Sequence, residues 1–111
     1  MIEETILNFL NAKLTEPVYM EAPEDKPMRY VLFEKTGSSK PNRLPASTFV
    51  FQSYAESLYQ AATLNESLKS AVESLVELNE ISKVQLNSDY NFTDTTTKQY
   101  RYQAVYDISH Y

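Results

Sequence analysis

Hydrophobic and polar residues alternate with a period of two along most of the segment 84–111, on both sides of a polar break at 93–98. This alternation is typical of strands that bury one face. We therefore predict a C-terminal antiparallel β-hairpin whose even-numbered face packs against a helix. That face holds Val84, Leu86, Tyr90 and Phe92 before the break, and Tyr100, Tyr102, Ala104, Tyr106 and Ile108 after it.

A different spacing marks the segment 55–78, where hydrophobic residues recur every three or four positions. Such spacing places them on one face of a helix, so it predicts one long central helix of about six turns. The same spacing over 2–14, which Pro17 ends, predicts an N-terminal helix.

The segments between these helices have the character of strands. We predict strands at 28–35 and 46–54, a short edge strand at 18–21 between two prolines, and an extended, mobile loop at 36–45. The expected fold is a single α+β domain over 1–111. In it, a single antiparallel β-sheet is flanked by an N-terminal helix and one long central helix, and the chain ends in the C-terminal β-hairpin.

Composition excludes several functional classes. The chain of 111 residues fits one domain, and the lack of cysteine excludes disulfides, thiolate zinc sites and thiol nucleophiles. A single glycine, Gly37, cannot build a phosphate-cradling loop, which needs several. The net charge of −5 disfavours dedicated nucleic-acid binding, because that affinity comes largely from cations. We find no signal peptide or long apolar run, so we expect a cytoplasmic protein where it is made.

Candidate catalytic and metal-binding residues are few. His110 is the only histidine, and no nucleophile or orienting group can be paired with it, so we favour a structural or surface role. Asp89, Asn91 and Thr93 have the spacing that begins a calcium-binding EF-hand loop. Asp94 stands where that loop requires glycine, however, and the twelfth position lacks glutamate. We expect no catalytic residue, metal or cofactor.

Two groups of surface residues are candidate interfaces. Lys40 and Arg43 form the densest cationic spot of an acidic chain, and their loop is either an ordinary solvated loop or a docking arm. Arg101, Gln103 and Asp107 lie on the odd-numbered face of the hairpin, which we expect to be free for a neighbouring subunit or a lumen. The nine tyrosines fit cross-strand packing, with contact to another subunit as the alternative.

Three blocks of the sequence resemble a known family. They are PVYMEAPEDKPMRYVLFEKTG, FVFQSYAESLYQAATLNESL and LNSDYNFTDTTTKQYRYQAVYDISHY, and the resemblance spans nearly the whole chain. They are similar to tail-terminator or tail-completion proteins of long-tailed bacteriophages and prophages of Gram-positive hosts, a group that includes the lambda tail terminator by fold. The resemblance implies an α+β fold, a hexameric ring on the head-proximal end of the tail tube, and no catalytic residues.

A function and a set of partners follow from this resemblance. The ring would stop tube polymerisation and enable head–tail joining, with further copies of itself, the tail tube protein and the head connector as partners. DNA would only pass through its lumen, no membrane would be involved, and the protein would reside in the virion tail after assembly in the host cytoplasm. Two alternatives stay open. One is a head-closure or connector adaptor of the phage neck, and the other is a small ligand-binding domain or hydrolase with a concave pocket.

Overall fold

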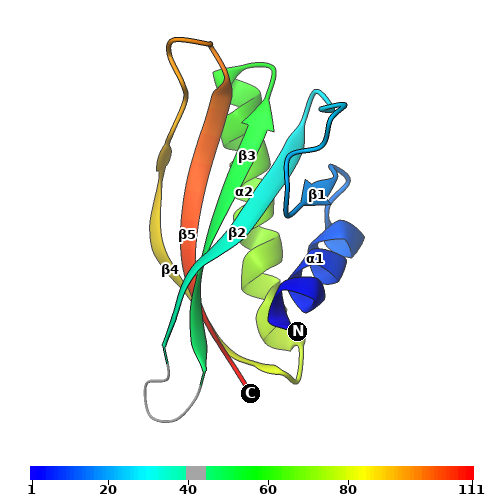
Figure 1. The fold of residues 1–111 in the computed structure, drawn as a ribbon, viewed down its shortest axis with the longest axis vertical. Helices are drawn as coiled ribbons and strands as arrows, with labels where there is room; N and C mark the ends of the chain where they lie inside the picture. Colours follow the sequence, from blue (N-terminus) through cyan, green and yellow to red (C-terminus); the bar gives the residue numbers. More distant parts are fainter. Residues whose placement is uncertain (40–44) are drawn as a thin grey trace.

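The computed structural model describes residues 1–39 and 45–111 (Figure 1). Five strands form one sheet in the order β1-β2-β3-β5-β4. β1 lies at one edge of the sheet and β4 at the other, while α2 runs along the sheet and α1 lies at the β1 side (Figure 1). The elements are α1 (Ile2–Lys13), β1 (Val18–Tyr19), β2 (Tyr30–Ser39), β3 (Ala46–Ala55), α2 (Leu58–Glu73), the 3-10 helix η2 (Ser74–Glu77), β4 (Ile81–Asn91) and β5 (Tyr100–His110).

The sheet is mixed, so the prediction of a single antiparallel sheet is wrong. β1 pairs with β2 in parallel, with Val18 opposite Val31 and Tyr19 opposite Leu32, whereas the other strand pairs are antiparallel. The direction of β1 is set by α1, because the Asn11 side chain accepts a hydrogen bond from Val18 N at 3.0 Å and donates one to Val18 O at 3.2 Å. The hydrophobic pattern contains no information on strand direction, so this pairing could not be seen in it.

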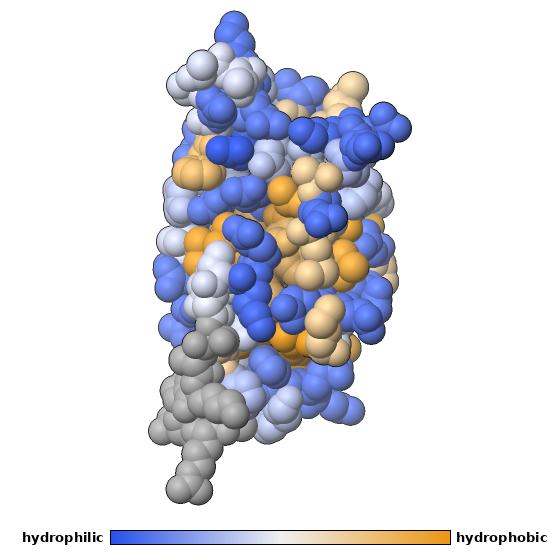
Figure 2. All heavy atoms as spheres, in the orientation of Figure 1, coloured by the Kyte–Doolittle hydropathy of each residue, from blue (hydrophilic) through white to orange (hydrophobic). Residues whose placement is uncertain are grey.

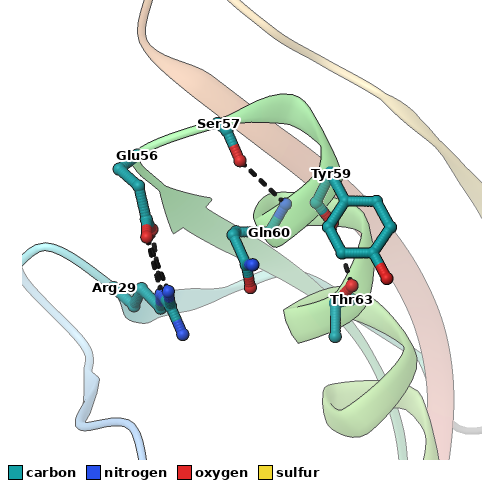
Figure 3. A network of polar contacts seen from close by, with 6 residues as sticks. All are labelled: Arg29, Glu56, Ser57, Tyr59, Gln60 and Thr63. Carbon is teal, nitrogen blue, oxygen red and sulfur yellow. Dashed lines mark hydrogen bonds and ion pairs between the residues drawn. The ribbon is translucent and has the colours of Figure 1, made fainter.

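The central helix is shorter than predicted. The sequence pattern gives one helix over 55–78, but α2 begins at Leu58 and ends at Glu73, where the 3-10 helix η2 takes over. Ser57 is the N-cap, and its hydroxyl accepts a hydrogen bond from Gln60 N at 3.1 Å (Figure 3). Because a capping side chain satisfies a backbone amide that has no partner within the helix, Ser57 fixes the start of α2.

The predicted C-terminal hairpin fits only in part. β4 and β5 pair in an antiparallel manner, but β4 begins at Ile81 rather than residue 84, and β5 stops at His110, one residue before the end. β4 also contains two register irregularities, one between Ile81 and Lys83 and one between Leu86 and Ser88. Each is a β-bulge with one extra residue in β4, and a bulge reverses which face the following side chains occupy.

Because of the second bulge, side chains in the second half of β4 lie on the opposite faces from those predicted. Leu86 lies opposite Tyr106, but Asp89 lies opposite Ala104 and Tyr90 opposite Gln103. Asp89 is therefore on the same face as the buried residues of β5, and Tyr90 is on the other face. The even-numbered pattern places Tyr90 and Phe92 beside Val84 on the helix side, and that prediction is wrong. In β5 the alternation holds, because Ala104, Tyr106 and Ile108 are all buried.

The first loop between long strands is also shorter than predicted. β2 continues to Ser39, and Gly37, Ser38 and Ser39 pair with Thr48, Ser47 and Ala46 of β3. Residues 36–39 are thus strand rather than loop, and the remainder of the predicted mobile loop falls partly on 40–44, outside the described residues.

The core lies between the two helices and one face of the sheet, which we call the inner face. Phe33, Phe49 and Phe51 form an aromatic cluster there, with ring centroids 5.4–6.3 Å apart. Burying each aromatic side chain removes a large apolar surface from water, so this cluster is a major source of stability. The buried hydrophobic residues packed into the core are Ile6, Leu10, Val18, Val31, Phe33, Phe49, Phe51, Leu64, Leu68, Ala71, Val72, Leu75, Ile81, Ala104, Tyr106 and Ile108.

Candidate functional site: the outer face of the sheet

No helix of the described residues covers the opposite face of the sheet, and we call it the outer face. In the view of Figure 1, β2 and β3 cross in front of α2, and Figure 2 shows hydrophobic residues gathered in the middle of the same view with hydrophilic ones around them. The strand registers bring together on the outer face Tyr19, Tyr30, Leu32, Glu34, Thr48, Val50, Gln52, Tyr54, Lys83, Gln85, Tyr90, Arg101, Gln103, Val105 and Asp107.

A continuous row of aromatic rings and one guanidinium runs from strand to strand across the outer face, and we call it the aromatic row. Tyr19 meets Tyr30 edge-on at 6.2 Å, and Tyr30 stacks on Tyr54 at 4.7 Å with an interplanar angle of 7°. Arg101 lies between Tyr54 and Phe92, and Phe92 meets Tyr90 edge-on at 5.9 Å. The row draws on all five strands, and Tyr30 and Tyr54 are only 5% and 7% exposed.

Arg101 is held rigidly within the aromatic row. Its guanidinium carbon is 4.7 Å from the centroid of Phe92 and 5.8 Å from that of Tyr54, which is the distance range of cation–π attraction. Its Nε donates to Phe92 O at 2.8 Å, and one Nη donates to the Tyr54 hydroxyl at 3.3 Å. In the described part of the chain Arg101 forms no ion pair with a carboxylate, and its direct contacts are these dipoles and rings.

A ladder of side-chain hydrogen bonds runs beside the aromatic row. The Tyr54 hydroxyl donates to Gln52 Oε1 at 2.9 Å, and Gln52 Nε2 donates to Gln103 Oε1 at 2.9 Å. Gln103 Nε2 in turn donates to the Tyr90 hydroxyl. Gln103 is only 8% exposed, yet the ladder satisfies both ends of its amide, as a buried polar side chain requires.

The remainder of the outer face is apolar at its centre and polar at its far end. Val50 and Val105 are half-buried cross-strand partners, and near them Met20 and Leu32 border a small hollow of about 120 Å³. At the far end Asp107 accepts hydrogen bonds from Thr48 Oγ1 at 2.7 Å and from the Asn87 side chain at 3.1 Å. Half-buried apolar residues framed by polar ones are the composition of a protein interface.

The inner face contains one polar cluster, beside α2. The bulge in β4 turns Asp89 inward, where it accepts hydrogen bonds from Asn65 Nδ2 at 2.7 Å and from Lys69 Nζ. These bonds, first that to Asp89 and then that to Glu66, raise the pKa of Lys69. The Tyr106 hydroxyl donates to Glu73 Oε2 at 2.7 Å, and burial followed by this bond raises the pKa of Tyr106. The side chains of this cluster bind one another across α2 and the hairpin, so the cluster acts as a structural lock between them.

The described residues contain no group of three or more histidine or acidic side chains placed to hold a metal ion. In the same parts of the chain, no helix is long and apolar enough to cross a membrane. His110 is half-buried at the end of β5, and its nearest polar contact is the carbonyl of Tyr111 at 3.4 Å from Nδ1.

Of the predicted interface residues, Arg101, Gln103 and Asp107 all lie on the outer face, in the aromatic row, the ladder and the far end respectively. Lys40 and Arg43 lie outside the described residues. Sequence reasoning missed the partners of Arg101, because the even-numbered pattern assigns Phe92 to the other face and Tyr54 belongs to a distant strand.

Comparison with known proteins leaves the family open, since the sequence matches no family model and no curated protein sequence.

Proposed function

We propose that the protein is a structural component of a bacteriophage tail, which caps the head-proximal end of the tail tube as a ring of identical subunits. In this role it ends tube polymerisation and offers a surface to the head connector. The proposal rests on the sequence resemblance and on the outer face, which is the observation that carries it. The described residues offer an organised contact surface and no metal-holding cluster.

The outer face has the chemistry of a docking surface. Tyrosine, phenylalanine and arginine are enriched in the energetically dominant part of interfaces. Here they are already ordered by stacking and hydrogen bonds, so little side-chain entropy is lost when a partner covers them. Tyr90 and Phe92 are 41% and 42% exposed, and together with Val50 and Val105 they supply apolar area that a neighbour could bury.

A ring requires each subunit to present two different surfaces that fit one another. The outer face is one such surface, and the edge of β4 (Ile81–Asn91) is a second, because no other strand among residues 1–39 and 45–111 pairs with its far side. Backbone groups at a free edge can add a strand from another chain. The tail tube and the head connector would then contact the two rims of the ring, with DNA passing through the lumen.

Deleting the gene from the phage or prophage that carries it is the direct test. We expect tails of irregular length that fail to join heads, seen by electron microscopy of the lysate. Normal tails that join heads normally would overturn the proposal. Tails of normal length that stay headless would instead favour the alternative role of a head-closure adaptor.

A pair of matched variants tests the outer face itself. Tyr90→Ala truncates a half-exposed ring in the aromatic row, whereas Tyr59→Ala truncates a ring that is 75% exposed on α2. Because a ring that cannot close through its subunit contacts holds the tube less tightly, we expect Tyr90→Ala to weaken binding to purified tail tubes by about tenfold or more, as truncation of an interface tyrosine commonly does. Co-sedimentation with tubes measures this. Equal binding by both variants would remove the outer face from the interface.

A further inference from the structure

A solvent-open hollow of about 520 Å³ lies at the end of the sheet that carries the β4–β5 turn. Three segments far apart in the sequence line it, namely the residues that lead into β2, the end of β3, and the turn between β4 and β5. Its volume is within the range of about 300–1,000 Å³ that is typical of ligand sites. The stacked rings of Tyr30 and Tyr54 form part of its wall, and Met28, 70% exposed, stands at its rim.

The two carboxylates that line the hollow already have partners. Arg29 binds Glu56 through two nitrogens at 2.6 and 2.8 Å (Figure 3), and this bonding lowers the pKa of Glu56 to about 2. Asp94 accepts hydrogen bonds from the backbone amides of Thr96 at 3.0 Å and Thr97 at 3.4 Å, which lower its pKa. Glu56 is thus neutralised by Arg29, whereas Asp94 keeps its negative charge, because the backbone amides that bind it carry no net charge.

The two lysines that line the same hollow, Lys26 and Lys98, are both exposed, and neither forms an ion pair with the described residues. Lys98 is the one non-glycine residue of the described chain with a positive φ, of 56°, a conformation fixed by the turn between β4 and β5. Two lysines against the single unpaired carboxylate of Asp94 leave the hollow with a net positive charge, within a chain of net charge −5. A fixed cationic spot on an acidic protein attracts anionic groups specifically to that place.

We infer that this hollow binds an acidic polypeptide segment of a partner protein, with carboxylate side chains between Lys26 and Lys98 and a neighbouring apolar side chain against Met28 and the tyrosine wall. An open hollow bounded by three segments suits side chains presented along an extended chain. Nucleic acid is disfavoured as the occupant, because a long polyanion extends beyond the hollow over a chain of net charge −5, whereas a short acidic segment can place its carboxylates at the two lysines alone. The hollow shares the rings of Tyr30 and Tyr54 with the outer face, but Lys26 and Lys98 lie beyond that face, and the inference does not depend on ring formation.

The test is a titration of the full chain, isotopically labelled, followed by two-dimensional amide NMR. The probe is a nine-residue peptide of alternating glutamate and phenylalanine, at low salt. The comparison ligands are the same peptide with glutamine in place of glutamate, and a single-stranded oligonucleotide of nine thymidines. We expect saturable shifts confined to 26–30, 54–56 and 94–100 with the acidic peptide, and at least about tenfold weaker binding of the glutamine peptide. Raising the salt concentration should weaken the binding of the acidic peptide, because mobile ions screen the attraction between its carboxylates and the lysines.

A double variant, Lys26→Gln with Lys98→Asn, is the decisive comparison. Asparagine is chosen at 98 because it tolerates the left-handed backbone, so the turn is kept. We expect this variant to bind the acidic peptide at least about tenfold more weakly, and the matched control Lys83→Gln, which removes an exposed lysine elsewhere on the sheet, to bind within twofold of the parent chain. Unchanged affinity of the double variant, shifts outside the hollow, or stronger binding of the oligonucleotide than of the peptide would each overturn the inference.

Discussion

The two faces of β5 bury their side chains by different means. Ala104, Tyr106 and Ile108 on the inner face are fully buried because α2 covers them. Gln103 on the outer face is also nearly buried, at 8% exposure, but only its neighbours in the ladder cover it. The inner face is therefore closed by hydrophobic packing perpendicular to the sheet, and the outer face by lateral contacts within one layer. A lateral layer can be covered by a partner without first losing contacts of its own.

Truncating a buried aromatic residue of the inner face should lower the free energy of unfolding most. Phe51 is 0% exposed and stacks on Phe33 with a centroid distance of 5.4 Å, so Phe51→Ala leaves a cavity and should lower the free energy of unfolding by about 3–5 kcal/mol. Val50→Ala, the adjacent change on the outer face, should cost only about 1 kcal/mol, because the side chain is partly in water already. Urea unfolding measures both, and equal losses would contradict the distinction between the faces.

Removing the acceptor in the polar cluster should have the next largest effect. Asp89→Ala leaves the Asn65 amide, in a residue 1% exposed, without its 2.7 Å partner, and should cost about 1–3 kcal/mol. Asp107→Ala is the outer-face counterpart, and it should cost less because water can replace its contacts to Thr48 and Asn87. Thermal unfolding ranks the two variants. A larger loss for Asp107→Ala would show that the cluster is not a lock.

A pH series tests the inner face through Tyr106. Its folded-state pKa lies above the ordinary tyrosine value of about 10, so above that pH the unfolded chain releases a proton that the folded chain keeps. The free energy of unfolding should therefore be unaffected by this group below pH 10, and should fall as pH rises beyond it, by up to about 1.4 kcal/mol per pH unit. Tyr106→Phe should reduce that slope, as measured by urea unfolding at several alkaline pH values. Tyr59→Phe, which removes an exposed hydroxyl on α2, is the control, and an equal reduction by both variants would refute the assignment.

The smallest expected effect lies in the turn between β4 and β5, which belongs to neither face. Lys98 has a φ of 56°, which is unfavourable for a residue with a Cβ atom, so Lys98→Gly should stabilise the fold by about 0.5 kcal/mol. Thr97→Gly, one position earlier with an ordinary φ, should destabilise it instead. A change of the same sign for both, in thermal unfolding, would mean that backbone strain at Lys98 does not matter.

Prediction from the sequence was most accurate where the hydrophobic pattern alone determined which face a side chain occupies. The alternation of β5 placed Ala104, Tyr106 and Ile108 in the core and Arg101, Gln103 and Asp107 on the opposite face, as found. The pattern failed where a contact from elsewhere in the chain decided the outcome. The clamp of Asn11 on β1 set a parallel direction, and the Ser57 cap outweighed the hydrophobic spacing that extends to residue 55.

The candidate sites were less accessible to sequence reasoning than the strands. The aromatic row needs the lateral register of five strands, and no local pattern contains a register. The hollow at the sheet end needs, in addition, knowledge of which charges are already neutralised, and Lys26 and Lys98 have no distinguishing feature in the sequence. Only the ion pair of Glu56 with Arg29 shows that the two lysines of the hollow outnumber its unpaired carboxylates.

The bulge between Leu86 and Ser88 also has a genetic consequence. The extra residue at Asn87 shifts the phase of β4, so that the distal half of the strand shows tyrosine and phenylalanine outward and an aspartate inward. No point substitution can reverse this assignment, because substitutions preserve chain length. Deletion of the codon for Asn87 would turn the tyrosine and the phenylalanine inward and the aspartate outward in one step. Deleting one codon would therefore change the exposed side chains of the hairpin more than any single amino-acid replacement.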